Sequence, residues 1–274
     1  MPMTRRRFLA RATAAATAAV AGGAGLAGAN RLEVRHSGAP SAPGAPTGGV
    51  RVALLTDMHA PHDWFDFDEL ARAVADFEPD LLVVAGDAFN RRGDEGLVRA
   101  YERLDARAGK FAALGNWEYQ SGCDLTRLAR EYERAGVRLL VNAAARVDVD
   151  GGRIRVVGLD DLLRGRPRLA PLRAADARAD RTLVLAHCPA LFDDVAAALG
   201  PADAPHVVLS GHTHGGQIAP FGRALVTPIG SGRFVKGWYA APDARHHLYV
   251  SRGLGNSDIP FRIGSRPELA LLTI

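Results

Sequence analysis

The sequence contains only two cysteines, Cys123 and Cys188, among 274 residues. Two cysteines cannot form the disulfide framework that holds small secreted domains together, so we expect both to be free thiols. The chain also lacks internal repeats and long runs of one charge. With 47% hydrophobic residues it has the composition of an ordinary globular protein and enough apolar material for a sizeable core.

The first 29 residues differ from the rest of the chain. Three arginines at positions 5–7 precede Phe8 and Leu9, and a stretch made mainly of Ala, Gly and Thr then ends in Ala27-Gly28-Ala29. A basic start, a weakly apolar middle and an A-x-A-like end are typical of a secretory signal, and the paired arginines favour the twin-arginine type. The middle is too rich in Ala and Gly for a permanent membrane span. The sequence therefore predicts export across the cytoplasmic membrane by the twin-arginine machinery, and an Arg-rich disordered tail is the alternative.

The positive charge of the chain is concentrated in this signal. The signal carries four arginines and no acid, and the remaining residues contain 30 basic and 30 acidic side chains. The net charge of +4 therefore belongs to the signal, and the body is formally neutral. Because nucleic-acid binding needs basic residues clustered on the folded body, we expect no nucleic-acid partner.

Beyond the signal, strand patterns alternate with helical patterns. Residues 30–49 are rich in Pro, Gly, Ala and Ser and predict a linker outside the fold. Apolar runs predict strands at 50–57, 80–87, 110–116, 137–143, 153–161, 182–189, 206–216, 247–255 and 267–274. Helical spacing predicts helices at 66–77, 94–106, 124–135 and 191–199. The alternation predicts an α/β layer fold in one domain, residues 50–274, with a second sheet packed on the first.

Residues able to bind metal follow five of the predicted strands. They are Asp57, His59, Asp87, Asn116, His187, His212 and His214. Functional sites of open α/β sheets gather at the carboxyl ends of strands, and residues two apart in extended chain point to the same side. Mixed carboxylate, imidazole and amide ligands suit Mn²⁺, Fe²⁺ or Zn²⁺. Seven ligands are too many for one tetrahedral ion, so the set predicts two divalent metal ions that share a bridging carboxylate.

These motifs, in this order, resemble those of the calcineurin-like metallophosphoesterases. Residues 210–218 and 250–274 are also similar to the branch of small bacterial enzymes that includes the YkuE and YaeI proteins. The resemblance implies a four-layer αββα sandwich, two mixed β-sheets flanked by helices, with a dinuclear site between the sheets. It also implies the ligand sets: Asp57, His59 and His214 for one metal, Asn116, His187 and His212 for the other, with Asp87 bridging both.

The resemblance implies hydrolysis of a phosphoester by a hydroxide formed between the two metals, without a covalent enzyme intermediate. Some relatives hydrolyse the pyrophosphate of UDP-diacylglucosamine. Export and this likeness together favour a phosphodiester or pyrophosphate substrate from the cell envelope, small or lipid-linked, and peripheral contact with a membrane. A phosphomonoesterase or nuclease is the enzyme alternative, and a weakly active, metal-dependent module that binds phosphorylated ligands is the other.

One position departs from the family motif. Trp117 stands where the family has a histidine that donates a proton to the leaving group, and an indole N–H cannot supply a proton. Three alternatives follow: the leaving group departs unassisted, His62 donates the proton, or the protein mainly binds its ligand. If His62 does not donate the proton, we expect it to be a solvated loop residue. Trp117 either shields the metals by packing or stacks on a substrate base or sugar.

Four further residues lie in the C-terminal part of the chain. Arg252 and Arg262 either contact phosphate or lie on the surface. His246 and His247 are expected to be an exposed pair before a strand.

Overall fold

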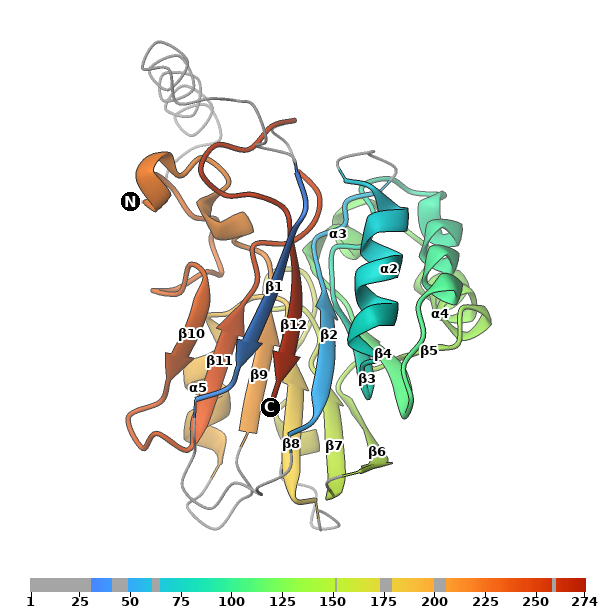
Figure 1. The fold of residues 1–274 in the computed structure, drawn as a ribbon, viewed down its shortest axis with the longest axis vertical. Helices are drawn as coiled ribbons and strands as arrows, with labels where there is room; N and C mark the ends of the chain where they lie inside the picture. Colours follow the sequence, from blue (N-terminus) through green and yellow to red (C-terminus); the bar gives the residue numbers. More distant parts are fainter. Residues whose placement is uncertain are drawn as a thin grey trace.

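The computed structural model describes residues 31–40, 49–60, 65–150, 152–172, 179–199, 206–257 and 260–274. Two six-stranded sheets stack face to face in it (Figure 1). Sheet one has the strand order β1 (Glu33–Gly38), β12 (Glu268–Thr273), β2 (Arg51–Leu55), β3 (Leu81–Ala85), β4 (Gly109–Ala113), β5 (Val137–Leu139). Sheet two has the order β10 (Gly237–Ala240), β11 (His246–Val250), β9 (His206–Ser210), β8 (Arg181–Leu185), β7 (Gly152–Gly158), β6 (Ala143–Val149).

Both sheets are mixed. In sheet one, β2, β3, β4 and β5 run parallel, while β12 is antiparallel to β2. In sheet two, β7, β8, β9 and β11 run parallel, and β6 and β10 pair antiparallel at the two edges. The carboxyl ends of β2, β3 and β4 therefore lie at one edge of sheet one, and those of β8 and β9 lie at one edge of sheet two.

The inner strands are apolar along their whole length because both of their faces are buried. In β2, Val52 and Leu54 pack between the two sheets, while Ala53 and Leu55 pack toward the helices on the outer face. Successive side chains of a strand point to opposite faces, so one continuous apolar run supplies two separate cores.

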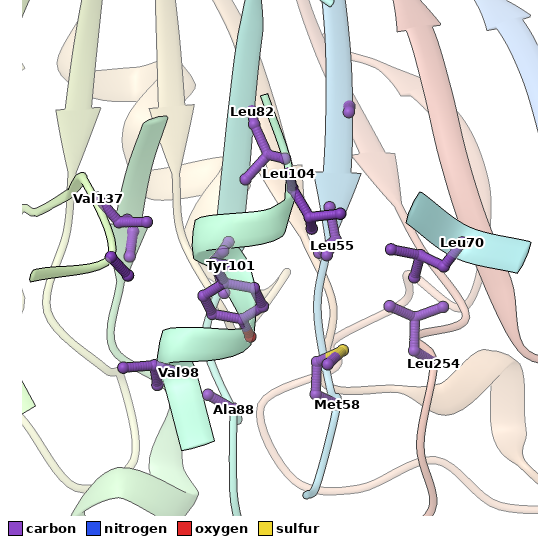
Figure 2. Close-up of a cluster of buried hydrophobic side chains, with 14 of the residues drawn as sticks. Leu55, Met58, Leu70, Leu82, Ala88, Val98, Tyr101, Leu104, Val137 and Leu254 are labelled. Carbon is purple, nitrogen blue, oxygen red and sulfur yellow. The ribbon is translucent and has the colours of Figure 1, made fainter. Parts of the chain in front are cut away.

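Helices cover the outer face of each sheet. Helices α2 (Phe67–Phe77) and α4 (Leu125–Arg134) and the 3₁₀ helix η1 (Asp94–Arg103) lie on sheet one, and α5 (Leu191–Ala198) packs on sheet two. Figure 2 shows Tyr101 of η1, Leu104 directly after it and Leu70 of α2 in one cluster with Leu55 and Leu82 of the sheet. This order of layers confirms the predicted αββα sandwich. The expected helix 94–106 is shorter and of the 3₁₀ type.

The expected linker contains a strand. Residues 33–38 form β1, which pairs in parallel with β12 over six positions, so the prediction that residues 30–49 lie outside the fold is wrong for this stretch. Side chains on distant elements hold β1: Trp238 Nε1 donates to Ser37 Oγ at 2.9 Å, and Arg252 Nη2 lies 2.9 Å from Glu33 Oε1. A composition rich in Pro, Gly and Ala did not indicate this pairing because the partner strand is at the far end of the chain.

Other expectations concern the cysteines and the C-terminal histidines. Cys123 and Cys188 are free thiols, as predicted. His246 and His247 are buried in β11, an inner strand of sheet two, and the expectation of an exposed pair is wrong. Among the described helices, none combines the length and the apolar composition needed to cross a membrane.

Candidate metal centre

The carboxyl ends of five strands bring the seven predicted ligands to one place between the sheets. Three strands of sheet one lead into Asp57, Asp87 and Asn116, and two strands of sheet two lead into His187 and His212. All seven side chains are buried. Ionisable groups are rarely buried unless they are paired or bind metal, so this concentration indicates a functional site.

The first cluster joins Asp57, His59 and His214, whose ligand atoms all lie within 4.8 Å of one another. Nε2 of His59 is 3.1 Å from Nε2 of His214, and Nε2 of His214 is 3.4 Å from Oδ1 of Asp57. Two imidazole nitrogens and a carboxylate oxygen that face one point form a donor set suited to a borderline divalent metal.

The second cluster joins Asp87, His187 and His212 by the same criterion. Nε2 of His187 is 3.1 Å from Oδ2 of Asp87 and 3.3 Å from Nδ1 of His212. The same Asp87 oxygen is 3.7 Å from Nε2 of His59, a member of the first cluster. Asp87 therefore lies between the two clusters, in the position of a shared ligand.

Asn116 supplies an independent test of whether a metal fits this site. Its side-chain Oδ1 is buried and has no hydrogen-bond partner within the described parts of the chain. The residues on either side of Asn116 both lie against Asp87: the Trp117 backbone N–H donates to Asp87 Oδ1 at 2.8 Å, and a Cβ on Gly115 would lie 2.3 Å from that oxygen. A buried amide oxygen without a partner is costly, and a metal ion in the second cluster would satisfy it.

The backbone of the site is held in an uncommon conformation. Five of the seven predicted ligands have left-handed φ angles: Asp57 51°, His59 49°, Asp87 55°, His212 71° and His214 50°. Non-glycine residues adopt this region rarely, and such strain persists where the surrounding structure imposes it, most often at active sites. At Gly211 the packing is also close, because an added Cβ would lie 2.1 Å from Asp57 Oδ2.

Hydrogen bonds on the outer side of three rings fix which nitrogen faces the centre. Nδ1 of His59 lies 2.5 Å from Asn90 Oδ1, Nδ1 of His187 lies 2.7 Å from the Ala85 carbonyl, and Nε2 of His212 lies 2.7 Å from the Ile229 carbonyl. Each of these partners only accepts, so the outer nitrogen carries a proton, and in the neutral form of each ring the inner nitrogen presents a lone pair. The role of Asn90 was not predicted from the sequence.

His214 has a different outer partner. Nδ1 of His214 accepts a hydrogen bond from Nη2 of Arg262 at 3.1 Å. Arg262 is fully buried, and its other N–H groups donate to backbone carbonyls, including that of Arg252 at 2.8 Å. Arg252 itself is ion-paired with Glu33 and Glu268. Neither arginine lies on the surface, and Arg262 holds a predicted ligand in place rather than facing solvent.

Burial and neighbouring charges set the protonation of the site. Burial lowers the pKa of His59 and His212, and burial with the Arg262 guanidinium lowers the pKa of His214 well below its usual range. Burial alone would lower the pKa of His187, but the Asp87 carboxylate raises it well above the usual range. Burial opposes ionisation of Asp87 too, yet His187 brings the pKa of Asp87 down to about 2. An ionised Asp87 and three neutral imidazoles are the forms that bind metal.

Trp117 lies beside the first cluster. Its half-buried indole ring meets the His59 ring edge-on, with centroids 5.6 Å apart and planes at 89°. No proton donor of the family type is therefore present at this position. His62, the alternative donor, falls in residues 61–64, outside the described part of the chain.

Glu118 is a functional residue that the sequence did not single out. Its buried carboxylate accepts backbone N–H groups from Gly115 at 2.8 Å, Ala88 at 2.7 Å and Asp87 at 3.1 Å. Burial and the Asp87 charge raise the pKa of Glu118 to about 7. Glu118 thus ties the loop after β3 to the start of helix α3 (Asn116–Gln120). The role of Glu118 could have been inferred from its position three residues after Gly115, which is the spacing of a capping box.

Glu118→Gln should lower the free energy of unfolding of the metal-free protein by about 1–3 kcal/mol. A glutamine has one oxygen, so at least one of the three buried N–H groups loses its acceptor. Urea denaturation measures the change, and Glu133→Gln on the exposed face of α4 is the matched control. Equal stability of the two variants would contradict the positioning role of Glu118.

A sandwich of two mixed sheets, with helices on both outer faces and two ligand clusters at its strand ends, is the architecture of a metallophosphatase. The family model for calcineurin-like phosphoesterases matches residues 50–216, a range that contains all seven predicted ligands, and the chain belongs to this family. The family expected from the motifs is thereby confirmed, and its members hydrolyse phosphoric esters.

Two bacterial relatives are similar over most of their length. The uncharacterised metallophosphoesterase YkuE of Bacillus subtilis is 28% identical over 236 residues, which are 82% of this chain and 79% of YkuE. The phosphodiesterase YaeI of Escherichia coli is 29% identical over 233 residues, 82% of each chain. Among solved structures, the NAD nucleotidase NadN of Haemophilus influenzae aligns with a TM-score of 0.52 at 13% identity, covering 75% of this chain and 45% of NadN. That likeness concerns the fold alone.

Proposed function

We propose that the protein hydrolyses phosphodiester or pyrophosphate bonds with two divalent metal ions, Mn²⁺, Fe²⁺ or Zn²⁺, held between its sheets. The observation that carries the proposal is the position of Asp87 between two buried ligand clusters, together with the buried and unpartnered oxygen of Asn116. When bound, such a metal pair neutralises a phosphate oxyanion and supplies hydroxide at neutral pH. Membership of the family and the phosphodiesterase name of YaeI support this bond type.

In this proposal the protein's own groups hold and orient the ions. Asp57, His59 and His214 hold one, Asn116, His187 and His212 hold the other, and Asp87 contacts both. The acceptors behind the His59, His187 and His212 rings keep the outer nitrogens protonated and fix the direction of the inner nitrogens, and a metal ion would displace the proton that Asp87 stabilises on His187. Binding then needs little rearrangement, because the strained loops already aim the side chains inward.

The indole of Trp117 narrows the range of substrates. Trp117 cannot protonate a leaving alkoxide. We therefore propose a leaving group that departs as a stable anion, such as one phosphate of a pyrophosphate. The twin-arginine-type signal, with its four arginines, supports a location outside the cytoplasmic membrane and an envelope-related or lipid-linked phosphoester such as a UDP-diacylglucosamine-like pyrophosphate. Fractionation of cells that express the full chain tests the location.

Removal and return of metal tests the activity itself. The full chain, stripped by chelation, should lose hydrolysis of bis-p-nitrophenyl phosphate and recover it with Mn²⁺, Fe²⁺ or Zn²⁺ at two bound equivalents. The monoester p-nitrophenyl phosphate, assayed in parallel, separates diesterase from monoesterase activity. Two bound equivalents without turnover of either ester, under any of the three metals, would contradict the proposal and favour a phosphate-binding module.

A further inference from the structure

Exposed apolar side chains gather on two loops. Among the described residues, six large hydrophobic side chains are exposed, and four of them lie in segments 162–169 and 217–232. Their exposed fractions are 37% for Leu163, 97% for Phe221, 50% for Leu225 and 72% for Ile229. We call these four residues the apolar rim. Single exposed hydrophobic residues are ordinary, but a concentration of them marks an interaction surface.

The apolar rim adjoins the candidate metal centre. The carbonyl of Ile229 is the outer hydrogen-bond partner of His212, at 2.7 Å from Nε2. A Cβ on Gly230 would lie 3.2 Å from His212 Nε2 and 3.4 Å from Leu163 Cδ1, so the two loops meet beside this ligand. Gly216, two residues after His214, packs against Ala224, between Phe221 and Leu225. A surface that engages the rim therefore lies next to the candidate metal centre.

Exposed charge on and beside these two segments is mainly positive. Residues 213–240, which extend the second segment on both sides, contain Arg223, Arg233 and Lys236 but no Asp or Glu, and residues 162–169 contain three arginines directly after the buried Asp160 and Asp161. Arg233 is paired with Asp193, while Arg223 and the three arginines of the other segment, Arg164, Arg166 and Arg168, are exposed. This local excess contrasts with the formally neutral body. An apolar rim surrounded by basic residues is complementary to an anionic lipid surface. The lipid headgroups attract the positive charges, and the bilayer interior accepts the apolar side chains.

We propose that the apolar rim and its arginines dock the protein on an anionic phospholipid bilayer, with the metal centre beside the lipid headgroups. The occupant follows from the combination of features: a small soluble substrate explains neither a Phe221 that is almost wholly exposed nor four exposed arginines on the loops that carry the apolar rim. The inference about the substrate rests on the proposed function: a docked enzyme acts on a phosphodiester or pyrophosphate whose apolar tail stays in the bilayer.

Vesicle co-sedimentation of the full chain tests the docking. The wild-type protein should bind vesicles of phosphatidylcholine mixed with phosphatidylglycerol and bind vesicles of phosphatidylcholine alone far more weakly. Phe221→Ser combined with Leu225→Ser should weaken binding to the mixed vesicles about tenfold or more, and Arg223→Glu should weaken it at low salt. Ile229 is left unchanged because its carbonyl contacts His212.

Matched controls are an exposed leucine and an exposed arginine remote from the rim in sequence, Leu97→Ser in η1 and Arg138→Glu in β5. The N-terminal 29 residues are present in every variant, so any lipid binding of their own cancels in the comparison. An unchanged thermal unfolding midpoint verifies that each variant is folded.

Equal vesicle binding by rim and control variants would overturn the proposal, as would equal binding to neutral and anionic vesicles. A rim variant that dissociates a dimer on gel filtration, with vesicle binding unchanged, would also overturn it and assign the rim to a second copy of the chain. The readout is binding and not hydrolysis, so failure here leaves the proposed metal-dependent activity standing.

Discussion

Asp87→Ala should release bound metal from both clusters and lower phosphodiester hydrolysis by on the order of a thousandfold. The reason is the position of its Oδ2, 3.1 Å from His187 Nε2 in one cluster and 3.7 Å from His59 Nε2 in the other. Removing this carboxylate leaves each cluster one ligand short. It also removes the negative charge that keeps two cations close together and that compensates His187.

Metal content by mass spectrometry after gel filtration measures the first effect, and turnover of bis-p-nitrophenyl phosphate measures the second. Asp160→Ala is the control, since Asp160 is also a buried carboxylate but accepts a hydrogen bond from the Tyr119 hydroxyl at 2.6 Å. The control should lose stability without losing metal. Two full equivalents of metal in Asp87→Ala would contradict the shared-ligand role.

Trp117→His should raise the hydrolysis of esters with poor leaving groups by up to about a hundredfold and change activated esters little. The indole of Trp117 lies against His59 at 5.6 Å between centroids, so an imidazole at this position lies beside the first cluster. A histidine titrates near neutral pH and can protonate a departing alkoxide, whereas nitrophenolate departs without help. The gain should therefore grow as the leaving group becomes more basic.

A series of phosphodiesters with leaving groups of increasing pKa, assayed at one metal concentration, measures this dependence. Trp238→His is the control, because Trp238 is a half-buried tryptophan that donates to Ser37 on β1 instead of lying beside the clusters. If Trp117→His accelerates activated and unactivated esters equally, the missing-acid interpretation is wrong, and Trp117 acts by packing alone.

The layered fold and the location of the candidate site could be predicted from the sequence because both depend on local patterns. Apolar runs of strand length indicated the strands, and in a parallel arrangement their carboxyl ends meet at one edge. The seven residues that follow these runs are the ones that the structure brings together. Asp66 and Asp124, each beside the start of a predicted helix, cap α2 and α4 by accepting backbone N–H groups.

What could not be predicted depends on contacts between distant segments. Strand β1 pairs with β12, more than two hundred residues later, and its own composition resembles a linker. Arg262 looked like a phosphate ligand or a surface residue, but carbonyls of the C-terminal loop and His214 surround it. Asn90 likewise reaches His59 from a loop after β3. No window of sequence contains both partners of any of these contacts, so local patterns carry no information about them.

Each ligand cluster takes members from both sheets. Asp57 and His59 follow a strand of sheet one, while His214 follows a strand of sheet two; Asp87 belongs to sheet one, while His187 and His212 belong to sheet two. An ion bound in either cluster therefore acts as a cross-link between the two halves of the sandwich, closing a chain loop that is very long in sequence. Because binding needs ligands from both sheets in their native positions, bound ions would stabilise the folded chain and oppose sliding of one sheet over the other. In a phosphoesterase of this design, bound metal ions would therefore stabilise the packing of the two sheets as well as take part in hydrolysis.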